Sequence, residues 1–263
     1  MKLPLALASA LALSLAACSA APDAETEAPV AQTVSADTLA AAVANEARPE
    51  EARALDDSRK PAEVLAFLGL EQGDDAADLI SGGGYWAEIL AEAVGEDGSV
   101  TALEPEQFYN EERWTALAEA QPGIALERYR FEDFQSAPDR FDFAVMNLVY
   151  HDLYWTSEQF DVPRSEPADY LATLYAAMKP GGVVGVIDHA ANPGDTRETV
   201  EDLHRIDPAT VRADFEKAGF VLEAESDLLA NAEDDRTTNV FAPDIRGKTD
   251  RFVMKFVKPA ARE

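Results

Sequence analysis

The segment Asp78–Pro105, which reads DLISGGGYWAEILAEAVGEDGSVTALEP, decides the fold. It runs from an apolar stretch through Gly82, Gly83 and Gly84 into a run whose apolar residues recur at helical spacing. A second short apolar stretch ends at Glu104. This order predicts a strand, a glycine turn, a helix and another strand, which form half of a nucleotide-binding α/β unit. The glycines allow a tight turn close to a ligand, and Glu104 stands where a carboxylate can accept hydrogen bonds from both ribose hydroxyls.

One interpretation of this segment is a dinucleotide site. Gly82, Gly84 and Ala87 satisfy the G-x-G-x-x-G/A pattern, and Glu104 follows about twenty residues later, as the pattern requires. This interpretation implies an oxidoreductase that uses NAD or NADP. A dinucleotide fold would more often continue with a sixth parallel strand, which the end of this chain does not suggest.

The same segment resembles motif I of the class I S-adenosylmethionine-dependent methyltransferases, whose pattern is acid-x-Gly-x-Gly-x-Gly. Asp78 stands at the acid position, where dinucleotide-binding folds usually keep the strand apolar. Ile80 departs from the motif, because the family usually has glycine there and a β-branched residue disfavours a left-handed backbone. We expect Gly83 to restore that freedom further along the turn.

The order of elements along the chain predicts the topology. Strands alternate with helices, which implies a parallel sheet with right-handed crossovers, and two final strands joined by a loop imply an antiparallel hairpin. The expected fold class is α/β: a Rossmann-like seven-stranded methyltransferase sheet, mostly parallel with an antiparallel C-terminal hairpin, in three αβα layers. Beyond motif I, we expect helices at 37–44, 61–70, 106–120, 170–178 and 207–217, strands at 124–131, 141–148, 183–188, 220–226 and 251–257, and a loop at 152–167.

Three further segments resemble the same family between Pro61 and Pro259. Phe141-Asp142 resembles the start of its fourth strand, Met178–Gly182 its LKPGG turn, and Lys217–Phe220 its AGF segment. More narrowly, GGGYW, Asp188-His189 and the segment Asn239–Arg251 resemble a group of predicted exported bacterial methyltransferases.

The resemblance implies that S-adenosylmethionine is the cofactor and assigns residues to it. Asp78 with Gly82, Gly83 and Gly84 would bracket the methionine part, Glu104 would bind the ribose hydroxyls, Asp133 or Glu132 would lie near the adenine amine, and Asn147 would lie below the sulfonium. The alternative role for Asp78 and Glu104 is capping of a helix or turn, and for Glu132 and Asp133 a solvated turn.

The chain has three histidines, and two of them are candidate catalytic residues. His151 follows the fourth strand and His189 follows the fifth, so both should face the crevice at the carboxyl ends of the strands. Each stands beside an acid, and a histidine steered by a carboxylate could remove a proton from a methyl acceptor. The alternative is that they cap strand ends or bind the 152–167 loop. For His204, at the expected start of a helix, we expect a structural role.

No metal site is predicted. Two histidines and two acids could hold an ion, but the chain has no local ligand spacing such as H-x-x-x-H.

A basic cluster near the C-terminus is the candidate substrate site. Arg246, Lys248 and Arg251 lie in the segment that joins the last two strands, which should overhang the crevice. An arginine fork binds carboxylate or phosphate through two hydrogen bonds, so the cluster could hold an anionic group of the substrate with His151 as base. The alternative is that these cations neutralise nearby acids, namely Asp234, Asp235, Asp244 and Asp250.

The composition is strongly acidic, with 50 acidic and 22 basic residues and a formal net charge of −28. Such a surface repels the phosphates of nucleic acids and anionic lipid headgroups, so a nucleic-acid partner is not expected. The acidity otherwise favours solubility, for instance in salty surroundings.

The N-terminus predicts export. Leu3–Ala17 is apolar and too short to span a bilayer comfortably, and Leu15-Ala16-Ala17-Cys18 resembles a lipobox, in which Cys18 would carry the lipid. We therefore expect a signal peptide at 1–18, a disordered acidic linker at 19–36 and the domain at 37–263. Ser19 favours the periplasmic face of the outer membrane of a Gram-negative cell, with the lipid as the only membrane contact. The alternative is an ordinary secretory signal.

These observations leave three functions open. The first is a methyltransferase that uses S-adenosylmethionine on a small molecule, for which the basic cluster suggests an anion. The second is the NAD(P)-dependent oxidoreductase. The third is a non-catalytic exported binding protein of the same fold, favoured by Ile80 and by the cytoplasmic origin of S-adenosylmethionine. The oligomeric state is left open.

Overall fold

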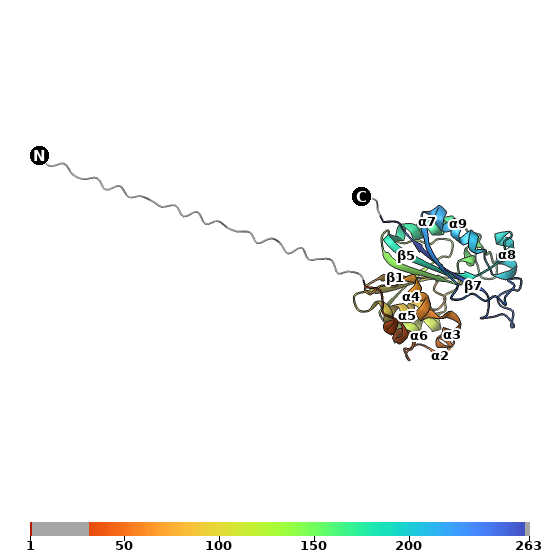
Figure 1. The fold of residues 1–263 in the computed structure, drawn as a ribbon, viewed down its shortest axis with the longest axis horizontal. Helices are drawn as coiled ribbons and strands as arrows, with labels where there is room; N and C mark the ends of the chain where they lie inside the picture. Colours follow the sequence, from red (N-terminus) through yellow and green to blue (C-terminus); the bar gives the residue numbers. More distant parts are fainter. Residues whose placement is uncertain (2–31, 261–263) are drawn as a thin grey trace. The chain divides into compact units, whose positions relative to one another are not determined.

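The computed structural model describes Met1 and residues 32–260. In residues 32–260, seven strands form one sheet in the order β3-β2-β1-β4-β5-β7-β6 (Figure 1). All neighbouring strands are parallel except β7, which is antiparallel to β5 and β6. The predicted mostly parallel sheet with an antiparallel end is confirmed. The strands are β1 Asp75–Leu79, β2 Ser99–Pro105, β3 Ile124–Tyr129, β4 Phe141–Asn147, β5 Met178–His189, β6 Val221–Ser226 and β7 Arg251–Val257.

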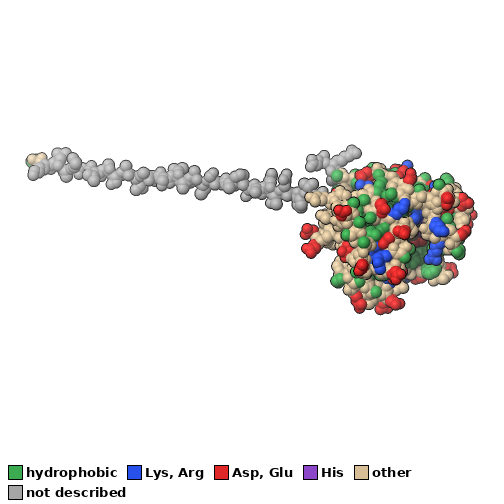
Figure 2. All heavy atoms as spheres, turned by 60° about the horizontal axis from the view of Figure 1, so that its bottom comes forward, with side chains coloured by type: hydrophobic (Ala, Val, Ile, Leu, Met, Phe, Trp, Pro, Cys, Tyr) green, Lys and Arg blue, Asp and Glu red, His purple; other side chains and the backbone are tan. Residues whose placement is uncertain are grey.

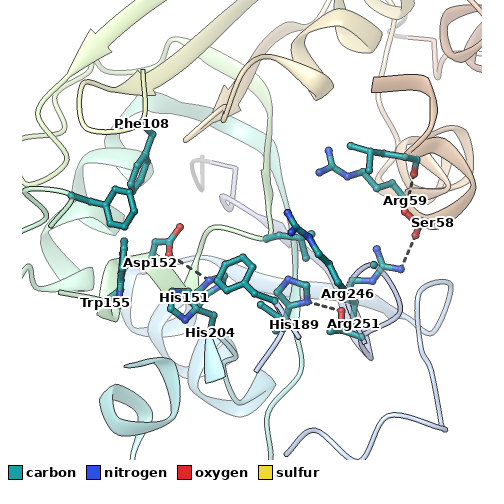
Figure 3. A pocket seen from close by; sticks show the side chains of 17 residues that line it. Ser58, Arg59, Phe108, His151, Asp152, Trp155, His189, His204, Arg246 and Arg251 are labelled. Atoms are coloured by element: carbon teal, nitrogen blue, oxygen red, sulfur yellow. Dashed lines mark hydrogen bonds and ion pairs between the residues drawn. The ribbon is translucent and has the colours of Figure 1, made fainter. Parts of the chain in front are cut away.

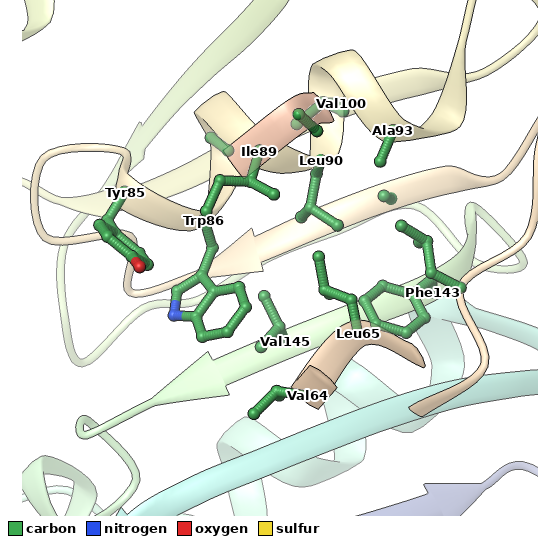
Figure 4. Close-up of a cluster of buried hydrophobic side chains, with 14 of the residues drawn as sticks. Val64, Leu65, Tyr85, Trp86, Ile89, Leu90, Ala93, Val100, Phe143 and Val145 are labelled. Atoms are coloured by element: carbon green, nitrogen blue, oxygen red, sulfur yellow. The ribbon is translucent and has the colours of Figure 1, made fainter. Parts of the chain in front are cut away.

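Helices cover both faces of the sheet, as the three-layer prediction requires. Side chains of α1, α4, α5 and α6 share one hydrophobic cluster with β1, β2 and β4. Figure 4 labels the part of this cluster that α4 and α5 form with β2 and β4. Side chains of α7 and α9 share a second cluster with β4, β5 and β7. The helices are α1 Ala36–Val43, α2 Glu50–Arg53, α3 Asp56–Arg59, α4 Pro61–Leu68, α5 Tyr85–Val94, α6 Glu111–Ala120, α7 Pro167–Ala177, α8 Thr196–Leu203 and α9 Pro208–Ala218, with the 3₁₀ helix η1 at His151–Tyr154.

The glycine turn joins β1 to α5 through close packing. Gly84 precedes α5 with φ 85°, and a Cβ there would lie 2.4 Å from Cδ2 of Leu117 on α6. A larger residue would therefore push α6 away. The neighbouring carbonyl of Gly83 accepts a hydrogen bond from Nε of Arg113, also on α6, at 2.8 Å. Packing against α6 thus demands part of the glycine pattern, independently of any ligand.

Ile80 adopts the backbone conformation that its side chain disfavours. Its φ is 51°, so the turn keeps the left-handed geometry that glycine usually supplies at this position. Gly83 is left-handed further along the turn, with φ 97°, as we expected, but it does not spare Ile80 the same conformation. Such a conformation costs on the order of 1–3 kcal/mol in a non-glycine residue. The Ile80 side chain is 3% exposed and packs in the hydrophobic cluster, which offsets that cost.

Several predicted boundaries differ from the structure, each for a local reason. The helix expected from residue 106 begins at Glu111, because the Asn110 side chain caps it by accepting from the Arg113 N–H. Helix α7 begins at Pro167, which suits a first helical position. Strand β5 begins at Met178, because the expected turn pairs with Lys258 through Gly181 and Gly182.

Helix α8 is missing from the sequence-based expectation. Asp195 caps it by accepting from the Glu198 N–H at 3.0 Å. The helix ends at Leu203, and His204 follows as its C-cap with a φ of 51°. His204 therefore lies at the end of a helix, and our expectation that it starts one is wrong.

The N-terminal predictions fall mostly outside the described residues. Cys18, the signal peptide and most of the linker lie in residues 2–31. Packing of the domain has begun by Val34, which is 4% exposed and whose N–H donates to the Leu70 carbonyl at 2.8 Å. None of the helices in the described part of the chain has the length and apolarity needed to cross a membrane.

Candidate functional site

A cavity of about 710 Å³ opens at the carboxyl edge of the sheet. His151 follows β4, His189 ends β5, and Arg251, which starts β7, pairs with His189 across the sheet. All three histidines of the chain line this cavity, as do Arg59, Arg246 and Arg251 (Figure 3). The expectation that His151 and His189 share one crevice is confirmed.

Asp188 holds His151 in place. The Asp188 side chain is fully buried, and its carboxylate accepts the backbone N–H of His151 at 2.9 Å and that of His189 at 2.7 Å. The same carboxylate lies 2.8 Å from Nδ1 of His151. A buried carboxylate with three such partners is fully satisfied, and it fixes the ring orientation of His151.

His151 carries a proton at neutral pH. Burial opposes its charge, but Asp188 and then Asp152, whose Oδ1 lies 3.4 Å from Nε2, outweigh burial and raise the pKa of His151 to about 9. Burial raises the pKa of Asp152 to about 6. A ring that is already protonated accepts no second proton, so His151 is suited to orienting or donating to a ligand. The role of base that we expected for His151 does not match this environment.

His189 is neutral and better suited to accept a proton. Its Nδ1 lies 2.7 Å from the hydroxyl of Thr249, on the segment that precedes β7. Burial lowers the pKa of His189 to about 3, and the charges of His151, Arg251 and Arg205 act in the same direction. A ring held neutral by burial is available as an acceptor at neutral pH, although its low pKa makes it a weak base.

His204 also lines the cavity, although we expected a structural role for it. Its ring lies 5.7 Å from that of His151 and 5.2 Å from that of Trp155, measured between ring centres. Its Nδ1 is buried without a hydrogen-bond partner in the described structure, and burial lowers the pKa of His204 to about 4. The signal that could have placed His204 is the pair Asp195 and Glu198, which marks the start of α8.

Only two of the three residues of the basic cluster line the cavity. Arg246 and Arg251 line the cavity, whereas Lys248 is exposed and does not. Two of the acids that could have neutralised the cluster have other partners: Asp234 pairs with Arg205 at 2.8 Å and Asp250 pairs with Arg236 at 2.7 Å. The sequence did not indicate Arg59, which reaches the cavity from α3 and lies over the ring of Tyr85, with 4.2 Å between guanidinium carbon and ring centre.

The acids expected to bind the cofactor make capping contacts in the glycine turn. Asp78 is 2% exposed and accepts from the Ser81 hydroxyl at 2.5 Å and from the Ala87 N–H, in the first turn of α5, at 3.1 Å. Glu104 is fully buried, and its Oε2 accepts from the Gly82 N–H at 2.7 Å. Burial raises the pKa of each acid to about 7. Both acids thus have the capping role that the sequence left open as an alternative.

Two buried oxygens at this edge are still without a donor. Oε1 of Glu104 and Oδ1 of Asn147 have no hydrogen-bond partner of ordinary geometry in the described structure, although the Trp114 side chain lies close enough to Glu104 to act against the rise of its pKa. Gly82 is exposed beside them, and a Cβ there would meet only the Ile80 carbonyl oxygen, at 3.8 Å. Orphaned acceptors at the positions expected to bind ribose and the methionine end fit a ligand that supplies hydroxyl and ammonium donors.

The remaining predicted residues add little to the site. Asp133 is exposed and accepts from the Gln135 amide at 3.1 Å, while Glu132 pairs with Arg130 at 3.1 Å. Both contacts match the solvated turn that the sequence left open. Among the described residues, no group of three or more His, Cys, Asp or Glu side chains is arranged to hold a metal ion.

Comparisons with known proteins identify the fold. No family model matches the chain, and no curated protein matches its sequence. Among solved structures, a methyltransferase from Aquifex aeolicus that depends on S-adenosylmethionine aligns with a TM-score of 0.54 at 20% identity, covering 80% of this chain and 98% of that one. A methyltransferase of the same kind from Mesorhizobium loti aligns with a TM-score of 0.54 at 17% identity, covering 77% and 99%.

A third structure contains a ligand. The 1,6-didemethyltoxoflavin-N1-methyltransferase of Burkholderia thailandensis, with 1,6-didemethyltoxoflavin and S-adenosylhomocysteine bound, aligns with a TM-score of 0.52 at 16% identity, covering 78% of each chain. At these identities the likeness concerns the fold. The chain has the fold of the S-adenosylmethionine-dependent methyltransferases.

Proposed function

We propose that the protein is a methyltransferase that uses S-adenosylmethionine to methylate a small molecule with an anionic group. The pair of orphaned oxygens on Glu104 and Asn147 carries this proposal, because they stand at the glycine turn of a methyltransferase fold. The adjoining cavity holds a neutral histidine and three arginines. S-adenosylmethionine, when bound, supplies a methyl group on a positively charged sulfur.

The chain's own residues would position the reactants. Glu104 would accept hydrogen bonds from the ribose, and Asn147 from the methionine end. His189 would accept the proton that a hydroxyl or amine acceptor loses, while Arg246 and Arg251 would bind the anionic group. Orientation of two reactants is the main requirement of methyl transfer, and a rigid pocket supplies it.

Calorimetry on the full chain tests the cofactor. We expect S-adenosylhomocysteine to bind with a micromolar dissociation constant, about 8 kcal/mol, because its hydroxyl and ammonium groups satisfy the orphaned acceptors. NAD should give no measurable heat. Binding of NAD without any response to S-adenosylhomocysteine would replace this proposal with the oxidoreductase.

A non-catalytic binding protein is a second candidate. The left-handed Ile80, where the methyltransferase motif usually has glycine, favours it. This candidate predicts that ligands bind in the arginine-lined cavity while neither S-adenosylmethionine nor S-adenosylhomocysteine binds at all.

We also propose that the protein is exported and anchored by a lipid on Cys18, on the periplasmic face of the outer membrane. Cys18→Ser should abolish lipidation and leave the signal peptide uncleaved by the lipoprotein pathway. Labelling with a radioactive fatty acid, followed by separation of membrane and soluble fractions, measures this. A Cys18→Ser protein that still takes up label would show that Cys18 is not the lipidated residue.

A further inference from the structure

The apolar side chains that remain exposed gather at the cavity. In the described structure the exposed large apolar residues are Met1, Leu55, Phe160, Val221 and Phe241. Leu55, Phe160 and Phe241 line the cavity. Leaving such side chains in water is unfavourable, and a concentration of them in a concave site indicates an apolar ligand.

The apolar end of the cavity is aromatic. The ring of Trp155 lies 5.7 Å from that of Phe160, and the ring of His204 lies 5.0 Å from that of Phe241, between centres. Phe108 stands at the same end as Trp155, and Figure 3 shows both on the opposite side of the histidines from the arginines. Aromatic faces and edges at such spacing suit a planar ring, which gains more from stacking than an alkyl chain does.

The other end of the cavity is cationic. Every arginine in residues 32–260 forms an ion pair with an acid except Arg53, Arg59, Arg246 and Arg251. The last three of these line the cavity. Acidic side chains are spread over the molecular face in Figure 2, so unpaired arginines in one cavity are not explained by a shortage of acids.

Arg251 in particular has no carboxylate paired with its buried guanidinium in residues 32–260. The residue is 8% exposed, and one Nη donates to the Ser58 carbonyl at 2.6 Å. Its Nε is buried without a partner in the described structure. Burial lowers the pKa of Arg251 and the charge of Arg59 lowers it further, so the two cations repel each other. An anion between them would satisfy the orphaned donor and remove the repulsion.

We propose that the cavity binds an aromatic acid, with the ring at the Phe108–Trp155 end and the carboxylate or phosphate at Arg246, Arg251 and Arg59. This inference names the substrate class of the methyltransferase proposed above and rests on it for the reaction, but not for binding. The ligand as a whole then spans the middle of the cavity, where His189 can face a hydroxyl or amine substituent.

Four probes separate the contributions to binding, measured by calorimetry on the full chain. 4-Hydroxycinnamate has both the ring and the carboxylate, its methyl ester lacks the charge, and octanoate lacks the ring. We expect 4-hydroxycinnamate to bind at least about tenfold more tightly than either, because only it uses both ends of the cavity. Phenyl phosphate distinguishes phosphate from carboxylate. Equal affinity for octanoate would overturn the aromatic part, and equal affinity for the ester would overturn the anionic part.

Neighbouring cations provide matched variants. Arg246→Ala should weaken 4-hydroxycinnamate about tenfold or more, since it removes a guanidinium that lines the cavity. Lys248→Ala, which removes the same charge two residues away and outside the cavity, should change the affinity less than about twofold. Both side chains are exposed, so the melting temperatures should agree with that of the parent protein. Equal losses in the two variants would show that only overall charge matters.

Titrations with and without saturating S-adenosylhomocysteine separate this inference from the proposed function. Binding of the aromatic acid with no binding of S-adenosylhomocysteine would leave the cavity's ligand class standing and remove the methyltransferase. Binding of S-adenosylhomocysteine with no response to 4-hydroxycinnamate or phenyl phosphate would overturn the aromatic-acid proposal alone.

Discussion

Asp188→Asn should lower the free energy of unfolding at pH 7 by about 3–5 kcal/mol, the largest effect we expect from any single change. The Asp188 carboxylate accepts three hydrogen bonds in a fully buried position, and one of them joins it to the ring of His151. Asparagine keeps the shape but removes the charge that balances His151. The buried ring must then either lose its proton or remain charged without a counterion.

The pH profile identifies the cause. The pKa of His151 is raised to about 9 from an ordinary 6.5, so its stabilising contribution is complete below pH 6.5 and is lost as the pH rises toward 9. In Asp188→Asn that loss should be largely absent, and urea unfolding at pH 6, 7.5 and 9 measures it. Asp152→Asn removes a charge from the other side of the same ring and is the matched control, with a smaller expected effect because Asp152 lies 3.4 Å away. A variant with the parent's stability and profile would contradict the buried pair.

Glu104→Gln should make the protein more stable at pH 8 while weakening its proposed cofactor site. Burial raises the pKa of Glu104 to about 7 from an ordinary 4.5. An acid with a raised pKa in the folded state loses stability as the pH rises from 4.5 to 7, here by up to about 3 kcal/mol. Glutamine does not ionise, so the stability of the variant relative to the parent should increase over that interval and stay constant above it.

The same variant should bind S-adenosylhomocysteine about tenfold more weakly at pH 8, because an amide accepts ribose hydrogen bonds less strongly than a carboxylate. Glu119→Gln, an exposed carboxylate on α6, is the control and should change neither quantity. Urea unfolding and calorimetry at matched pH measure the two effects. Unchanged affinity with increased stability would mean that Glu104 only caps the turn.

The sequence predicted those site residues that directly follow a strand of the parallel sheet. His151 and His189 each follow a strand of the parallel sheet, and the carboxyl ends of such strands meet at one edge, so their meeting follows from topology alone. His204 reaches that edge through α8, whose start is marked only by the capping pair Asp195 and Glu198, so its place does not follow from the strand pattern.

Arg59 could not be predicted from local pattern. It lies on the four-residue helix α3, far along the chain from β7, and the two meet where Arg251 donates to the carbonyl of Ser58. Hydrophobic periodicity reports local structure, so it does not predict a residue whose role depends on a contact between segments far apart in the sequence. The charges of Arg246 and Lys248 looked equivalent in the sequence, and only the fold separates the one that lines the cavity from the one that does not.

The glycine motif predicted the turn correctly but for an incomplete reason. Gly84 is required by the close approach of Leu117, and Ile80 shows that the left-handed geometry persists where glycine is absent. A glycine in a sequence pattern indicates only that the residue must be small or have a left-handed backbone. Packing against α6 and the approach of a bound ligand each impose that requirement. The pattern therefore identifies the turn with more certainty than it identifies the ligand.

The contrast between the acidic surface and the arginine-lined cavity affects how fast an anion arrives, apart from how tightly it is held. An approaching anion meets a molecule of net charge −28 before it reaches Arg246. Salt at physiological strength shortens the range of that repulsion to about 8 Å, while contacts with the guanidinium groups of Arg59 and Arg251, which are half-buried and buried, are screened less. Association should therefore quicken as ionic strength rises, the reverse of a cationic site on a neutral protein. The acidic surface should therefore slow the association of anions at low salt and leave the association rate of neutral molecules unchanged at any salt concentration.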